Sequence, residues 1–155
     1  MAGVMPFADR GVVAVTGRTV VPLPPEPTDN ERNTAGLAQS EFITANCFCR
    51  RDALEQLGGF DERFTVAWRE DSDLQFRLLD AGGRIVRAAE AVVVHPVRAA
   101  RWGASLREQR KSLFDALLFR KHPARFRRSI RPQCPWLYYA IVLAAGAALG
   151  LALAG

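Results

Sequence analysis

The fold is decided by the stretch from Phe42 to Pro96, which reads FITANCFCRRDALEQLGGFDERFTVAWREDSDLQFRLLDAGGRIVRAAEAVVVHP. Its centre is an acidic knot, residues 68–73, which carries Glu70, Asp71 and Asp73 and opens a helical pattern. Like charges so close together repel one another, so packing alone seldom selects three carboxylates within four residues. Such groups usually hold a cation, accept a proton or cap a helix.

A structural role for the acidic knot follows from helix capping. Asp71 or Ser72 would accept the free backbone N–H groups at the start of a helix predicted over Ser72–Ala81. Acidic side chains also suit the positive end of the helix dipole. Capping alone would explain the sequence EDSD, so a catalytic and a structural role both stay open at this point.

The surrounding pattern alternates strands and helices, which predicts an α/β protein. Gly11–Leu23 predicts one or two strands around Gly17, and Arg84–Val94 predicts one strand, or two broken near Ala88. Paired glycines that follow a helical pattern are typical helix ends. The other predicted elements are a loop over Pro22–Pro27, a short helix within Asp29–Ser40, a helix over Arg50–Leu57 ended by Gly58 and Gly59, and a loop over Asp61–Arg69.

Several short motifs occur in a defined order: Gly-Gly-Phe-Asp-Glu at 58–62, the acidic knot, Leu-Gln-Phe-Arg-Leu at 74–78, Gly-Gly at 82–83 and a strand ending in His-Pro. This ordered set resembles the C-terminal half of the catalytic domain of family 2 glycosyltransferases. The resemblance covers roughly residues 11–98. It implies an α/β chain with a partial GT-A (nucleotide-diphospho-sugar transferase) fold in residues 1–98.

The resemblance implies an inverting enzyme that moves a sugar from a nucleotide donor to an acceptor hydroxyl. A sugar hydroxyl is a poor acid, so a carboxylate must take its proton as the new bond forms. By resemblance, Asp71 is the general base and Glu70 supports it. The acceptor pocket is expected to include Gly59, Phe60, Asp61, Trp68 and Asp73.

The leaving nucleoside diphosphate gains charge in such a reaction, which a divalent cation and basic groups would stabilise. The family therefore implies Mg²⁺ or Mn²⁺, with His95 at the position of an additional metal ligand in some members. A single histidine at a strand end is more often structural. Arg107 and Arg110 are candidate diphosphate contacts, with a solvated or headgroup-facing surface as the alternative.

The chain departs from the family pattern upstream of Phe42, where no Asp-x-Asp motif occurs. The acidic residues upstream of Phe42 are Asp9, Glu26, Asp29, Glu31 and Glu41, and no two of them form Asp-x-Asp. We therefore expect the nucleotide-binding half to be missing and the activity of this chain alone to be doubtful. Two other classes stay open: a non-catalytic membrane-anchored module that pairs with a separate nucleotide-binding chain, and a metal-dependent phosphotransfer or hydrolase site built on the acidic knot with His95 and His122.

Charge divides the chain sharply. Residues 1–97 carry ten Arg and no Lys against fourteen Asp and Glu, whereas residues 98–132 carry eleven basic and two acidic residues. A basic run of this kind is also found in nucleic-acid patches. The uncharged tail that follows it favours a membrane instead, because positive residues collect on the cytoplasmic side of a span.

The tail from Pro132 to Gly155 carries no charged residue, and Leu137–Ala154 is an apolar run of 18 residues. Trp136, Tyr138 and Tyr139 stand at its start, where an aromatic belt belongs. We predict a basic amphipathic juxtamembrane segment at 99–131 and a transmembrane helix at 132–155, with a buried soluble helix as the alternative. The expected place is the cell inner membrane, with the catalytic part facing the cytoplasm. The expected partners are a nucleotide-sugar donor and a glycan or lipid-linked acceptor of cell-envelope polysaccharide synthesis, and no nucleic acid.

Overall fold

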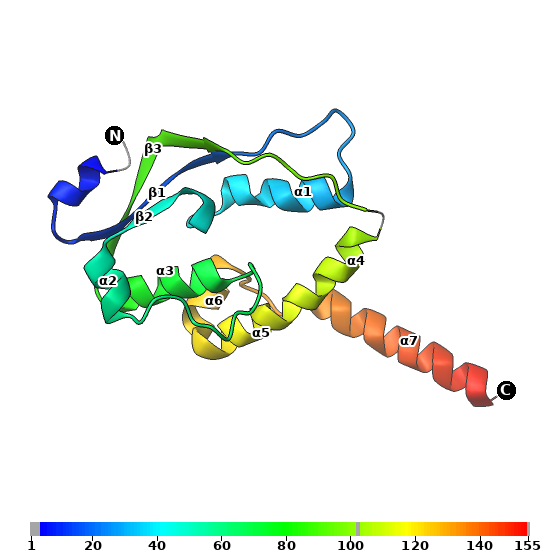
Figure 1. Cartoon of the computed structure of the whole chain (residues 1–155). Coiled ribbons are helices and arrows are strands. Elements are labelled where there is room, and N and C mark those ends of the chain that lie inside the picture. The colour runs from blue at the N-terminus through cyan, green and yellow to red at the C-terminus, as the bar shows by residue number, and fades with distance from the viewer. Residues whose placement is uncertain (1–3, 102, 155) are drawn as a thin grey trace. The chain divides into compact units, whose positions relative to one another are not determined.

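A computed structural model describes residues 4–101 and 103–154 (Figure 1). The chain forms two compact units, Met1–His122 and Pro123–Gly155, and each is described by itself. The basic segment predicted at 99–131 is therefore shared between the two units, and the predicted domain boundaries stay predictions.

The first unit is built on a three-stranded sheet in the order β2-β1-β3. The central strand β1 (Val12–Val20) pairs antiparallel with β2 (Cys47–Cys49) and parallel with β3 (Arg84–Val94). The two strand pieces considered around Gly17 are thus one continuous strand. The parallel partner needs a long crossover, and residues 21–83, which contain β2 and three α-helices, supply it.

Gly17 lies within β1 at a point where Ala91 and Asn46 approach the backbone too closely for a side chain. A β-carbon at this position would lie 2.2 Å from the carbonyl oxygen of Ala91 and 2.4 Å from Nδ2 of Asn46. That amide donates to the carbonyls of Arg18 (3.1 Å) and Ala91 (2.9 Å). The register of β1 against β3 shifts at this point, from Ala88 to Val92. The expected break near Ala88 is therefore a bulge within one strand.

The helices of the first unit follow the predicted pattern with small differences in their bounds. Helix α1 (Asp29–Ala35) begins with a capping box, in which Thr28 and Glu31 satisfy each other's backbone N–H groups. Helix α2 (Arg51–Gln56) ends before Gly58 and Gly59, which both have positive φ angles. Helix α3 runs over Glu70–Asp80. Short 3-10 turns complete this part of the unit: η1 (Met5–Ala8), η2 (Gly36–Gln39) and η3 (Thr44–Asn46).

Helix α3 lies between the sheet and the helix α5 (Ser112–Lys121) (Figure 1). On the sheet side, Leu74 and Leu78 pack with Ala14 and Phe42 in a buried cluster. The neighbour of Ala14 on the strand, Val15, belongs to a different buried cluster, because successive side chains of a strand point to opposite faces. Apolar packing of Leu74 and Leu78 thus fixes α3 against the sheet.

The first part of the basic amphipathic segment predicted at 99–131 is not one continuous helix. It consists of α4 (Ala104–Glu108), the 3-10 turn η4 (Gln109–Lys111) and α5, while Trp102 lies outside the described residues. The second unit contains α6 (Pro123–Ser129) and α7 (Trp136–Ala154). Among the described residues, one segment, Trp136–Leu153, is long and apolar enough to cross a membrane, and none of it is buried. Length and composition alone are weak grounds for a span.

Candidate active site

The acidic knot forms the first turn of α3, because the helix begins at Glu70, two residues earlier than predicted. The N-cap position is Arg69, whose side chain makes no capping hydrogen bond to the described residues. Asp71 sits inside the first turn, where its Oδ1 accepts from the backbone N–H of Ser72 at 2.7 Å. Asp71 therefore accepts a free backbone N–H group from a position inside the helix, and the N-cap residue is Arg69.

Arg69 is held in a left-handed conformation with φ 72°, which is uncommon for a residue with a side chain. Its Nε donates to Asp115 Oδ1 on α5 at 2.6 Å, and the indole N–H of Trp68 donates to the same oxygen at 3.1 Å. The guanidinium also lies 5.0 Å from the centre of the Trp68 ring. Helix α5 thus fixes the strained turn that precedes Glu70 and Asp71, and strained residues of this kind cluster at functional sites.

The carboxyl groups of Glu70 and Asp71 are partly buried, and burial raises the pKa of both. For Asp71 the hydrogen bonds from Ser72 offset part of this rise in pKa. Oε2 of Glu70 is buried without a hydrogen-bond partner among the described residues. Carboxyl groups with raised pKa values are suited to accept protons, which fits a general-base site.

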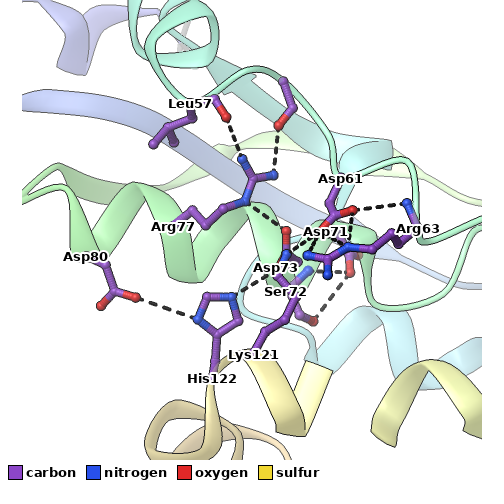
Figure 2. A network of polar contacts seen from close by, with 11 residues as sticks. Leu57, Asp61, Arg63, Asp71, Ser72, Asp73, Arg77, Asp80, Lys121 and His122 are labelled. Carbon is purple, nitrogen blue, oxygen red and sulfur yellow. Dashed lines mark hydrogen bonds and ion pairs between the residues drawn. The ribbon is translucent and has the colours of Figure 1, made fainter. Parts of the chain in front are cut away.

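Asp73 is fully buried, and it is the centre of the Asp73 network, which consists of Asp73, Arg77, Lys121 and His122 (Figure 2). Arg77 Nε donates to Asp73 Oδ2 at 2.8 Å, and His122 Nε2 lies 2.9 Å from Oδ1. The Lys121 ammonium also pairs with Oδ1. Burial raises the pKa of Asp73, but the hydrogen bonds from Lys121, His122 and Arg77 outweigh it and lower the pKa below its usual value.

The Asp73 network also holds the loop that precedes α3. Arg77 donates to the carbonyl oxygens of Leu57 at 3.0 Å and Gly59 at 2.7 Å. Lys121 Nζ donates to Asp61 Oδ2 at 2.5 Å, and it lies 5.4 Å from the centre of the Phe64 ring. Asp73 and the loop are therefore joined through the same two cations, as Figure 2 shows.

The five predicted acceptor-pocket residues differ in what they could offer a ligand. Phe60 is exposed, Asp61 is paired with Arg63 and Lys121, and Trp68 is bound to Asp115. Gly59 lies in a positive-φ turn, where its carbonyl accepts from Arg77 and its N–H donates to Leu54. Asp73 has no exposed surface, so a direct acceptor contact would require it to leave its network. Acceptor binding by this set stays a prediction.

The residues of the described chain do not fit a divalent metal. No three side chains of His, Cys, Asp or Glu within residues 4–101 and 103–154 are placed to hold one. His95 follows β3, its backbone N–H donates to Val20 at 2.8 Å, and its Nδ1 is buried without a described partner. His122, the other candidate ligand, is bound to Asp73 beside the Lys121 ammonium, and this positive charge opposes a cation there.

The remaining candidates lie away from the acidic knot in sequence. Arg107 on α4 and Arg110 on η4 are both exposed, and their diphosphate contact stays a prediction.

A pocket of about 180 Å³ lies at the C-terminal end of α3, where Leu78, Gly82 and Gly83 line it. Because α3 has 11 residues, that end is roughly 15 Å from the knot.

Comparison with known proteins identifies the family. A sequence model described as "Glycosyl transferase family group 2" matches residues 33–154, which include α3, α5 and α7. The chain belongs to this family. Its mixed α/β sheet agrees with a partial GT-A fold, as the motifs of residues 11–98 predicted. No curated protein and no solved structure matched the chain.

In this glycosyltransferase chain, sequence reasoning missed the contribution of α5. Asp115 and Lys121 are 44 and 48 residues beyond Asp71 and Asp73 in the sequence, within a segment that its basic composition assigned to the membrane surface. The pairing of Asp73 with Arg77 was readable, because residues four apart meet on one helix face. Nothing in the sequence pattern indicated that Lys121 folds back onto both Asp61 and Asp73.

Removal of Lys121 should destabilise the first unit. We expect Lys121→Met to lower the free energy of unfolding by roughly 3 kcal/mol, because it withdraws one cation from a buried carboxylate that keeps Arg77 and His122. Thermal unfolding in detergent, followed by intrinsic tryptophan fluorescence and near-UV circular dichroism, would measure it.

The matched control for Lys121→Met is Arg63→Met, which breaks the ion pair of Asp61 with a side chain that is 64% exposed. An exposed pair of this kind contributes less than about 1 kcal/mol. The double variant Asp73→Asn/Lys121→Met should lose less than the sum of its single variants. Equal effects of Lys121→Met and Arg63→Met would contradict a buried network.

The Asp73 network should also make stability depend on pH in the acid range. The pKa of Asp73 is lower in the folded state, so the unfolded state binds its proton more readily. Its stabilisation is therefore complete above the unfolded pKa of about 3.9 and is lost as the pH falls through the folded value. In unfolding measured from pH 6 to pH 3, Asp73→Asn should lose stability less steeply than the unchanged chain. Parallel slopes would refute the assignment.

Proposed function

We propose that this chain forms the acceptor side of an inverting glycosyltransferase, with Asp71 as the general base. The observation that carries the proposal is the position of Asp71, in the first turn of α3 with a pKa raised by burial, in a chain of glycosyltransferase family group 2. A carboxylate with a raised pKa takes a proton more readily from a weakly acidic hydroxyl. Glu70 would support it from the neighbouring position.

In the proposed reaction the acceptor hydroxyl oxygen attacks the anomeric carbon of the donor sugar and gives its proton to Asp71. The bond between that carbon and the diphosphate oxygen breaks, and the nucleoside diphosphate leaves with the electron pair. Attack from the side opposite to the leaving group inverts the configuration. The acceptor would approach over the loop that carries Gly59 and Phe60, which Arg77 and Lys121 hold in place.

Family 2 enzymes often use a divalent metal, but the described residues of this chain do not assemble a site for one. We assign no step to a metal here. The donor, a nucleotide sugar, and the acceptor, a glycan or a lipid-linked hydroxyl, are proposed from the family and from the apolar helix α7.

Replacement of the base should abolish sugar transfer without unfolding the protein. In a preparation that transfers sugar, we expect Asp71→Asn to reduce kcat by about a hundred- to ten-thousand-fold, because an amide cannot take the proton. Glu70→Gln should reduce kcat less. Product formation from a panel of radiolabelled nucleotide sugars would measure turnover, and the melting temperature would report folding.

Asp73→Asn serves as the contrast to Asp71→Asn, because Asp73 belongs to the buried network. It should lower the melting temperature more than it lowers kcat of the remaining folded protein. Near-normal turnover in Asp71→Asn would show that another group is the base. If Asp71→Asn, Glu70→Gln and Asp73→Asn all mainly lower the melting temperature, the acidic knot has only a structural role at the start of the helix.

We also propose that α7 anchors the chain in the cell inner membrane, with the first unit on the cytoplasmic side. The support is the uncharged helix Trp136–Ala154, its aromatic start and the net charge of +9 in residues 98–132. Positive flanks favour the cytoplasmic side of a span.

The anchor predicts where the protein fractionates. The intact chain should sediment with membranes and resist extraction by alkaline carbonate, whereas a chain cut after Arg131 should be extracted by it. Immunoblots of membrane and soluble fractions would measure both. Recovery of most of the intact chain in the soluble fraction without detergent would refute the anchor.

A further inference from the structure

The outward surface of α4, η4 and α5 carries a stripe of alternating leucine and arginine. We define the outer stripe as Leu106, Arg110, Leu113 and Arg120, which follow one another at intervals of four, three and seven residues. Leu113 and Arg120, seven residues apart, lie on one face of α5, and Leu106 on α4 and Arg110 on η4 precede them. The two leucines are 78% and 70% exposed, and both arginines are exposed.

The other face of the same helices is occupied by the protein itself. Phe114 packs against Phe64 with ring centres 5.9 Å apart, Asp115 binds Trp68 and Arg69, and Leu118 is fully buried. The rotation of α5 about its axis is therefore set by these contacts. On α5, Leu113 and Arg120 lie on the face that these contacts leave exposed, and Leu106 and Arg110 are exposed as well.

The charge of this region selects a negative partner. The segment 98–132 has eleven basic and two acidic residues, and both acidic side chains are already paired, Glu108 with Lys111 and Asp115 with Arg69. Basic side chains between large apolar ones are typical of helices that lie in the headgroup region of a bilayer, where long stems reach the phosphates and leucines enter the acyl boundary.

A membrane is also within reach along the chain. Fourteen residues, 122–135, separate α5 from the apolar helix α7, so the two ends are at most roughly 50 Å apart whatever their arrangement. We propose that the outer stripe lies on an anionic lipid surface, as a second membrane contact in addition to α7. Leu106 and Leu113 enter the acyl boundary, and Arg110 and Arg120 bind lipid phosphates.

This contact would place the candidate active site with respect to the membrane. Asp115, on the inner face of α5, holds the turn that precedes Glu70 and Asp71, so α5 links the outer stripe to the acidic knot. The proposal concerns lipid binding and rests on no step of sugar transfer. It deepens the proposed membrane attachment and has a separate test.

The test measures how fast a cysteine in the outer stripe reacts with a membrane-impermeant maleimide. The full-length chain, with Cys47, Cys49 and Cys134 changed to alanine, carries Leu113→Cys and is reconstituted into vesicles of phosphatidylcholine with or without about 30% phosphatidylglycerol. Gln56→Cys, at an exposed position on α2, is the matched control. Far-UV circular dichroism and intrinsic tryptophan fluorescence check that each variant is folded.

We expect labelling of Leu113→Cys to slow at least tenfold in the anionic vesicles relative to Gln56→Cys, and to recover in about 1 M salt, which screens headgroup attraction. Arg110→Glu with Arg120→Glu should restore labelling, whereas lysine at both positions should preserve protection.

Equal labelling of Leu113→Cys and Gln56→Cys in anionic vesicles would overturn the proposal, and flotation of the same vesicles shows separately whether α7 is inserted. If protection of Leu113→Cys from labelling depends on protein concentration in both lipid mixtures, the outer stripe binds a second copy of the chain and the lipid proposal is overturned. Protection that survives the double change to glutamate would overturn the role of the arginines.

Discussion

The buried carboxylate of Asp73 is the point on which this structure depends. A charge with no exposed surface is costly unless cations and hydrogen bonds surround it, and here three basic side chains do so. Those side chains come from α3 itself and from the end of α5. To satisfy the buried charge, the chain must bring Lys121 and His122 back to the start of α3. The carboxylate of Asp73 thus holds the end of α5 against the start of α3.

This constraint also explains the order of the loop before α3. Arg77 and Lys121 each bind Asp73 and, at the same time, a group of the loop: the carbonyl of Gly59 and the carboxylate of Asp61. A second attachment, from Asp115 to Arg69, holds the left-handed residue immediately before Glu70. The first turn of α3 is therefore supported on two sides, while Asp71 remains outside these ion pairs. Catalysis requires a reacting group to be held in a fixed geometry, and this support on two sides would provide it for Asp71.

Helix α5 gives the basic segment two different faces that its composition concealed. Its inner face, with Phe114 and Asp115, completes the candidate site. Its outer face displays Leu113 beside exposed arginines. Both faces are consistent with a glycosyltransferase whose acceptor side works close to a bilayer. A composition average over residues 98–132 registers only the net positive charge, because lysines turned inward and arginines turned outward count equally in it.

The sequence by itself determined the family, the α/β class, strands β1 and β3 and helices α1 to α3, and it proposed the acidic knot as the candidate site, because these follow from short motifs, periodicity and glycine positions. Its element bounds were less accurate: α3 begins at Glu70, since the strained turn at Arg69 depends on a partner 46 residues away. Gly17 was read as a possible break, although it permits close packing against Ala91. Tertiary structure alone decided that Asp73 is buried and that Lys121 belongs to the site, because both depend on contacts between residues that are distant in sequence.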